Sequence, residues 1–465
     1  MEPNSQLDVL LDQSGISRAG LAMRVNRLGA ETGVTLRYDH TAVARWVKGQ
    51  RPRGSVPELI CEVLGARLQR TLTLADIGMG GPRGASSPAS VQDAGDCGYA
   101  EEAAGVAADK ATLGRFVERA AVSWRADQMH TDAPGPALLR GAAAVAPVWE
   151  WENPPDDLDV SHDGAHEVSE MDVAVLHAAR GHYEHLYRNA GGVATRPRVV
   201  GFLTGEVAPL LRGSYSDRTG RELCRAAGSL AAVGGICAYD ADEQGLAQRY
   251  FHQALRLGKA SGDRHFGGYV VALLVNQALF LGDDRRAIAC AEAVLRTPGP
   301  HSTPALAADL YAMQAKAYAR IGDRRGAYDR MRSAESCSTR IRPDEEPEET
   351  GYVQPGLVQV RLAEALLVLG ELETARRYAE EAARAPAHVR GRVNRLATLT
   401  DVELQSGSAE SAAETAVQMV DHAQGIESQR LRQRMRRVRE HLLRHPGTPV
   451  DRAAKLIEET LRVPL

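Results

Sequence analysis

Basic side chains are concentrated near the start of the chain, between Arg18 and Arg53. This stretch holds eight basic residues and two acidic ones, a local charge of +6, whereas the whole chain has a net charge of −4. Guanidinium and ammonium groups at this density favour the phosphates of a nucleic-acid backbone. We expect the following residues to face such a ligand: Arg37, His40, Thr41, Ala44, Arg45, Lys48, Arg51 and Arg53.

Two helices joined by a loop are expected to position these side chains. The first begins near Ser17, whose hydroxyl can cap exposed backbone N–H groups, and the second runs from Asp39 as its cap to Gly49. Pro57 suits the first turn of a further helix, because a missing N–H costs nothing there. Apolar residues recur at helical spacing, so residues 1–80 are predicted to form one helical domain.

The order of residues along the second helix predicts different roles for them. In a helix-turn-helix, the first residues of the second helix enter the major groove of DNA. Arg45 is therefore predicted to pair with guanine, with His40 or Thr41 on a base edge or a phosphate. Lys48 and the basic residues after it are predicted to hold phosphates. The alternative is a small dimerisation domain whose charges are merely solvated.

Three segments resemble known regulators. ARWVKGQRPR (44–53) resembles the recognition-helix end of lambda-repressor-like (XRE-type) DNA-binding domains, and RTLTLADIGM (70–79) is similar to the variant found in actinobacterial regulators. The block Leu211–Phe280 resembles Streptomyces regulators that repress sporulation and antibiotic production. The resemblance implies a transcriptional repressor. A homodimer on a double-stranded DNA operator is expected, because two half-sites roughly add their binding free energies.

Composition sets the class of protein. With 465 residues, 44% of them hydrophobic and 25% charged, the chain is predicted to be a soluble protein of about three domains. Neither an apolar stretch long enough to cross a membrane nor a secretion leader is recognisable. The six cysteines lack a C-x-x-C spacing, which favours reduced thiols and a cytoplasmic location, associated with the nucleoid when DNA is bound.

Breaks in the pattern divide the rest of the chain. A stretch rich in Gly, Ser, Ala and Pro predicts a flexible linker over residues 81–110. Residues 111–215 are expected to be a helical middle region, in which the prolines of Ala133–Asp163 predict a loop. A regular pattern then covers residues 216–445.

The last region contains a repeated turn. A glycine is followed five residues later by an alanine four times, with glycine spacings of 40, 48 and 37 residues. The pairs are Gly282 with Ala287, Gly322 with Ala327, Gly370 with Ala375, and Gly407 with Ala412. Glycine relieves the steric problem of a tight turn, and alanine allows two helices to approach closely. The pattern resembles the tetratricopeptide repeat, so we expect an all-α solenoid of stacked helix pairs.

A ligand groove is predicted from the position six residues before each repeat glycine. In the tetratricopeptide pattern this position faces the concave surface, and it holds Asn276, Lys316, Glu364 and Asp401. The combination with a helix-turn-helix resembles the peptide-pheromone receptors of Gram-positive bacteria. That likeness implies a peptide, small-molecule or protein ligand. The alternative is that the four side chains are only solvated or interhelical.

The last predicted helix, Ser428–His445, is rich in arginine. Leu431, Met435, Val438 and Leu442 form one apolar face. We expect a helix that caps the solenoid; binding to DNA or an acidic partner, or packing at a dimer interface, are the alternatives.

Enzyme motifs are missing from the sequence. No G-x-x-x-x-G-K-[ST], H-E-x-x-H or G-x-S-x-G occurs, so no catalytic activity and no cofactor are expected. His182 and His185 are three residues apart, but no third ligand is forced to converge, and surface histidines are favoured over a metal site. The main alternative function is a tetratricopeptide scaffold whose helix-turn-helix does not bind DNA specifically.

Overall fold

The computed structural model describes residues 4–14, 16–31, 36, 38–52, 56–68, 72–74, 76–79, 112–129, 135–154, 157–296 and 302–463. They fold into two compact units, Met1–Asp93 and Ala94–Leu465. In the described ranges all regular structure is helical, with two isolated β-bridges and no strand, which confirms the all-α prediction. None of the described helices is both long and apolar enough to span a bilayer. The predicted linker, 81–110, lies outside the described residues.

The first unit is a small bundle around a single core. Its described helices are α1 (Ser5–Ser14), α2 (Arg18–Glu31), α3 (His40–Val47) and α4 (Val56–Leu68). Leu21, Val43 and Ile60 come from three different helices and are fully buried. Trp46 is also in this core, and its ring packs edge-on against Tyr38 at 5.1 Å between centroids. Burial of these side chains fixes α3 on α2.

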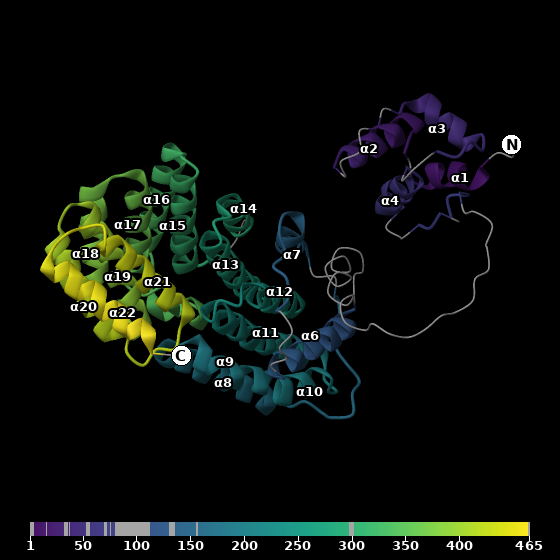
Figure 1. Ribbon diagram of the computed structural model, residues 1–465. Coiled ribbons are helices and arrows are strands. Elements are labelled where there is room, and N and C mark those ends of the chain that lie inside the picture. Colours follow the sequence, from purple (N-terminus) through teal and green to yellow (C-terminus); the bar gives the residue numbers. More distant parts are fainter. Residues whose placement is uncertain are drawn as a thin grey trace, which may run out of the picture. The chain divides into compact units, whose positions relative to one another are not determined.

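The second unit contains the other described helices, drawn from blue to yellow in Figure 1. They are α6 (Leu113–Gln128), α7 (Ala142–Glu152), α8 (Glu170–Ala190), α9 (Gly192–Phe202), α10 (Ala208–Leu211), α11 (Asp217–Asp240), α12 (Gln244–Ser261), α13 (Arg264–Phe280), α14 (Asp284–Leu295), α15 (Pro304–Arg320), α16 (Arg324–Ser338), α17 (Leu357–Leu369), α18 (Leu372–Arg384), α19 (Val389–Gln405), α20 (Ala409–Ala423), α21 (Gln429–Leu442) and α22 (Thr448–Arg462). A π-helical turn, Leu203–Val207, joins α9 to α10. Two 3₁₀ turns, Pro343–Glu345 and Glu348–Tyr352, precede α17.

From α11 to α20 the helices follow one another in pairs, as the repeated turn predicts (Figure 1). The four repeat glycines have φ between +75° and +83°, which an L side chain rarely adopts. The four alanines after them are 0% exposed. In the pair α11–α12 the positive φ belongs instead to Asp242, at +67°. The second unit is therefore an array of helix pairs joined by tight turns, an α-solenoid as predicted.

The Pro-rich stretch of the middle region differs from the predicted loop. Helix α7 occupies its centre and contains Pro147. Val148 and Trp151 lie on one face of α7 and are buried in the same core as α11–α15. Their burial outweighs the single backbone hydrogen bond that Pro147 cannot make. Trp124 of α6 belongs to this core too, and its indole N–H donates to Gln253 at 2.9 Å.

The two ends of the array meet. Asp240, at the end of α11, is fully buried and forms an ion pair with Arg390 of α19. The Ser428 hydroxyl and the Gly192 N–H each donate to the same carboxylate at 2.7 Å. The peptide of Glu427 adds two backbone hydrogen bonds, of 2.8 and 3.1 Å, to the junction of α8 and α9. The array is therefore closed on itself by a buried polar seam.

Candidate functional site

Helix α3 is fixed at its start by a side-chain cap. The Asp39 carboxylate accepts from the Ala42 N–H at 3.0 Å and from the Thr41 hydroxyl at 2.7 Å. The hydrogen bond from Thr41, more than the one from Ala42, lowers the pKa of Asp39. The helix stops at Gly49, where φ is +97°. Both ends of α3 therefore lie where the sequence predicts them.

The structure brings most of the predicted DNA-binding residues to one exposed stretch. His40, Thr41, Arg45, Lys48 and Arg51 are exposed, whereas Val43 and Trp46 point into the core. Ala44 is half-buried. Arg37 and Arg53 lie outside the described residues.

The exposed cations of this stretch have no acidic partner within the described residues of the chain. No ion pair joins Arg45, Lys48 or Arg51 to a carboxylate there, whereas Arg18 on α2 lies 3.4 Å from Asp8. An unpaired guanidinium on a rigid helix needs no carboxylate displaced before it meets a phosphate or a base edge.

Two asparagines position α3 and were missed by the sequence reasoning. Asn26 of α2 donates to the Tyr38 carbonyl and accepts from the Tyr38 N–H, both at 2.8 Å. Asn4 caps α1 and donates to the Ile77 carbonyl at 2.8 Å, and its N–H reaches the Val47 carbonyl at 2.8 Å. A lone asparagine in a polar segment carries no signal of a long-range contact, so the pattern could not reveal them.

The four predicted groove residues lie on the first helices of four successive pairs, α13, α15, α17 and α19. They take part in one polar surface, which we call the inner face. Lys316 of α15 pairs with Glu364 of α17 at 2.6 Å. The Asn276 amide of α13 donates to the Tyr239 hydroxyl at 3.0 Å. Asp401 of α19 contacts a different helix, α21. The inner face is therefore acidic and aromatic at several points.

Helix α21 covers the inner face. Arg434 lies 3.4 Å from Asp401 and 3.7 Å from Glu364, and His441 lies 2.9 Å from Asp401. The Arg430 guanidinium stacks over the rings of Tyr239 and Phe280, at 3.8 and 3.9 Å. The predicted groove is thus occupied by the chain itself.

Helix α21 also has the apolar face that the sequence predicts. Its four apolar residues are buried with α19, α20 and α22. Helix α22, which the sequence analysis did not identify, follows it.

On the inner face, burial and the attraction between opposite charges shift pKa values in opposing directions. Burial alone would raise the pKa of Glu364, but the charges of Lys316 and Arg434 outweigh it and lower that pKa to about 2. Burial lowers the pKa of Lys316, and Glu364 only partly offsets this. Burial also lowers the pKa of Arg430 to about 9.

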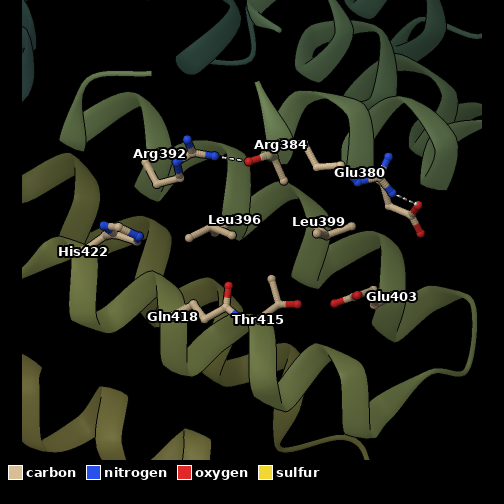
Figure 2. Close-up of a pocket in the computed structure, with 10 residues that line it drawn as sticks. Glu380, Arg384, Arg392, Leu396, Leu399, Glu403, Thr415, Gln418 and His422 are labelled. Atoms are coloured by element: carbon tan, nitrogen blue, oxygen red, sulfur yellow. Dashed lines mark hydrogen bonds and ion pairs between the residues drawn. The ribbon is translucent and has the colours of Figure 1, made fainter. Parts of the chain in front are cut away.

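A cavity of about 560 Å³ lies elsewhere, among α18, α19 and α20 (Figure 2). Leu396 and Leu399 lie in its middle, and charged side chains line it on several sides. Glu403 of α19 is 6% exposed, and its Oε2 atom has no hydrogen-bond partner. Burial raises the pKa of Glu403, and a hydrogen bond from Thr415 only partly offsets this. None of these residues was singled out from the sequence, because a glutamate on a helix is ordinarily solvated.

The histidine-rich stretch 162–185 does not form a ligand cluster. Among the residues that the structure describes, no three His, Cys, Asp or Glu side chains are grouped so as to hold a metal. His182 and His185 are exposed on α8, and His162 bonds the Gly213 carbonyl at 2.7 Å. The described cysteines are free and buried.

Comparison with known proteins gives a family-model match for the first unit and matches among solved structures. A family model described as the SP15 N-terminal domain matches residues 7–80, which fall within the first unit. No curated protein matches the sequence. Among solved structures, the crystal structure of the P58(IPK) TPR domain at 2.5 Å is similar over 63% of this chain and 95% of that one, with 12% identity and a TM-score of 0.15.

Proposed function

We propose that the chain is a DNA-binding transcriptional regulator whose second unit is an interaction module for dimerisation and ligand or protein binding. The observation that carries the proposal is the exposed basic row on and after α3, formed by Arg45, Lys48 and Arg51, which no described carboxylate pairs with. A chain with net charge −4 gains nothing structural from concentrating cations there, whereas DNA phosphates are attracted to them.

The roles follow from position on α3. Arg45 is exposed one turn after the capped start of the helix, which suits a base edge in the major groove. Lys48 and Arg51 follow the helix and suit phosphates. The contacts of Asn26 hold α3 against α2, so that the basic row moves with the bundle as a rigid body.

The finer proposal is a homodimeric repressor of sporulation and antibiotic-synthesis genes that acts on a palindromic operator. It is supported by the resemblance of residues 44–53, 70–79 and 211–280 to XRE-type and Streptomyces regulators. The competing proposal is a protein-interaction scaffold, which is favoured by the array of helix pairs.

The test is selection of genomic DNA by the purified full chain at about 150 mM salt, where non-specific attraction is screened. An enriched palindromic motif is expected. Arg45→Ala should abolish the preference for that motif. Arg51→Ala should weaken the binding of all DNA sequences alike, and it should lower the number of counterions released on DNA binding by about one.

Arg325→Ala is the matched control, because Arg325 is exposed on α16 and the change removes the same charge. It should leave motif and affinity unchanged. An absence of enrichment, or an equal loss with Arg325→Ala, would reject the proposal in favour of a scaffold.

A further inference from the structure

The cavity among α18, α19 and α20 has a shape that the repeats create. Residues of three consecutive helices, α18, α19 and α20, line it. Arg392 and Glu403 are eleven residues apart on α19, about 16 Å along a helix that rises about 1.5 Å per residue. Leu396 and Leu399 lie between them. The lining of the cavity therefore runs along α19 from Arg392 to Glu403, with the two leucines between these charged groups.

Charge is separated along this cavity. Figure 2 shows Arg392 and His422 at one end and Glu380 and Glu403 at the other. The Glu380 carboxylate is neutralised by Arg376 at 3.1 Å and by Arg384 at 2.7 Å.

Arg392 and Glu403 are not neutralised in this way. Arg392 donates to the Ala383 carbonyl and has no carboxylate partner within the described part of the chain. Glu403 forms no ion pair with any described cation, and its Oε2 has no hydrogen-bond partner. The cavity thus holds one uncompensated positive and one uncompensated negative group.

A buried carboxylate oxygen without a hydrogen-bond donor destabilises the fold, because it has lost its water and gained no partner. Native proteins keep such groups where a ligand or another donor satisfies them. Oε2 of Glu403 would be satisfied by an ammonium group, and the Arg392 guanidinium by a carboxylate. A ligand with both groups matches the cavity, provided that its middle is apolar enough to lie on the two leucines.

We propose that this cavity binds a short peptide with free ends, its carboxylate on Arg392 and its amino group on Glu403. An extended chain spans about 3.4 Å per residue, and the two side chains reach inward from their ends, so about four residues fit. A volume of about 560 Å³ lies in the usual range for small-ligand sites. The inference rests on the part of the proposed function that gives the second unit a ligand, and it places that ligand away from the inner face.

The test uses the full chain and a pool of four-residue peptides with free ends and leucine at the two central positions. The chain is incubated with the pool, separated by size exclusion, and retained peptides are identified by mass spectrometry. Free-ended peptides should be retained. The same pool with acetylated amino ends, or with amidated carboxyl ends, should bind about tenfold or more weakly, since each loses one charge-assisted hydrogen bond.

Two variants assign the binding to this cavity. Glu403→Gln should weaken binding of the free-ended pool at least about tenfold, yet it keeps the side-chain shape and should not lower the melting temperature. Arg392→Gln should do the same at the carboxylate end. The matched controls are Glu410→Gln on α20 and Arg325→Gln on α16, both exposed and outside the cavity, and they should bind as the unchanged chain does.

No retention of the free-ended pool overturns the proposal, and so does retention that neither variant reduces. If a pool with one blocked end is retained as well as the free-ended pool, the proposed recognition of that end is wrong. DNA selection by the same preparations measures operator binding separately from peptide retention, so a loss of operator binding and a loss of peptide binding can be told apart.

Discussion

The ion pair of Lys316 and Glu364 joins two repeat helices at the centre of the inner face. Both side chains are largely buried, and their 2.6 Å separation places full charges in a region of low water content. Such a pair adds little net stability compared with apolar residues, but removing one partner leaves the other buried and uncompensated.

Glu364→Gln is therefore expected to destabilise the chain by about 3 kcal/mol at pH 7. Because the pKa of Glu364 is lowered from 4.5 to about 2, its stabilising contribution is present above pH 4.5 and disappears as the pH falls towards 2. The difference between variant and unchanged chain, measured by urea unfolding, should shrink over that interval. Glu373→Gln, at an exposed position of α18, is the control and should have no effect at either pH. A difference that is the same at pH 7 and pH 3 would contradict this origin.

At the level of single residues, the sequence predicts which side chains share the inner face, but it does not predict which side chains they contact. The spacing rule places Lys316 and Glu364 on one surface, and the structure shows them in contact. It gave no hint that Arg434, seventy residues beyond Glu364, would reach the same carboxylate. Contacts between residues so far apart in sequence depend on the curvature of the whole array. That curvature is the sum of the small rotations between neighbouring helix pairs, which no local sequence pattern encodes.

The turn between paired helices is the element that repeats most faithfully. Gly322 has φ +83°, and a Cβ atom added there would meet nothing within 4 Å. The glycine is therefore required by the backbone conformation alone, without any close neighbour. This is why the turns were predictable from the sequence: their cause is local and steric.

Gly322→Ala should cost about 1–2 kcal/mol, the penalty of a left-handed conformation for an L residue. Gly114→Ala is the matched control, because Gly114 lies in helix α6 and an added Cβ also meets nothing within 4 Å there. That change should be neutral or stabilising by about 0.5 kcal/mol. Thermal unfolding of the two variants side by side distinguishes them, and equal melting temperatures would show that the turn is not strained.

Helix α7 shows where element prediction fails. The prolines around it predict a loop, and only tertiary burial of Val148 and Trp151 makes a helix of that segment. The prediction for helix α21 is correct for its apolar face only. Its apolar face was predictable from the spacing of Leu431, Met435, Val438 and Leu442, all of which are buried. Its basic face could not be assigned, since the rings that Arg430 covers belong to helices about 150–190 residues earlier.

The closure of the array is a property of the whole second unit. Asp240 accepts hydrogen bonds or an ion pair from three segments that are far apart in sequence, and it is fully buried among them. A repeat array normally unfolds unit by unit, because each unit contacts only its neighbours. A seam between the first and last units couples their stabilities.

Arg390→Met leaves Asp240 buried without its cation and should cost about 3–5 kcal/mol. Hydrogen–deuterium exchange should speed up first at Gly192 and around Glu427, on both sides of the seam, while α15 and α16 exchange as before. Adding Asp240→Asn should recover part of the loss, because it removes the uncompensated charge. If amide exchange instead speeds up equally in all helices, the seam does not open independently of the rest of the second unit.

The same seam restricts how this protein can evolve. Open arrays gain and lose whole units by duplication or deletion, and their descendants differ in length. A duplicated helix pair inserted between α13 and α19 would carry Arg390 away from Asp240 and separate Arg430 from Tyr239. Closure therefore fixes the number of helix pairs, as closure of a barrel fixes its number of strands. Descendants of this protein are expected to differ in the turns between helices and to keep the same number of helix pairs.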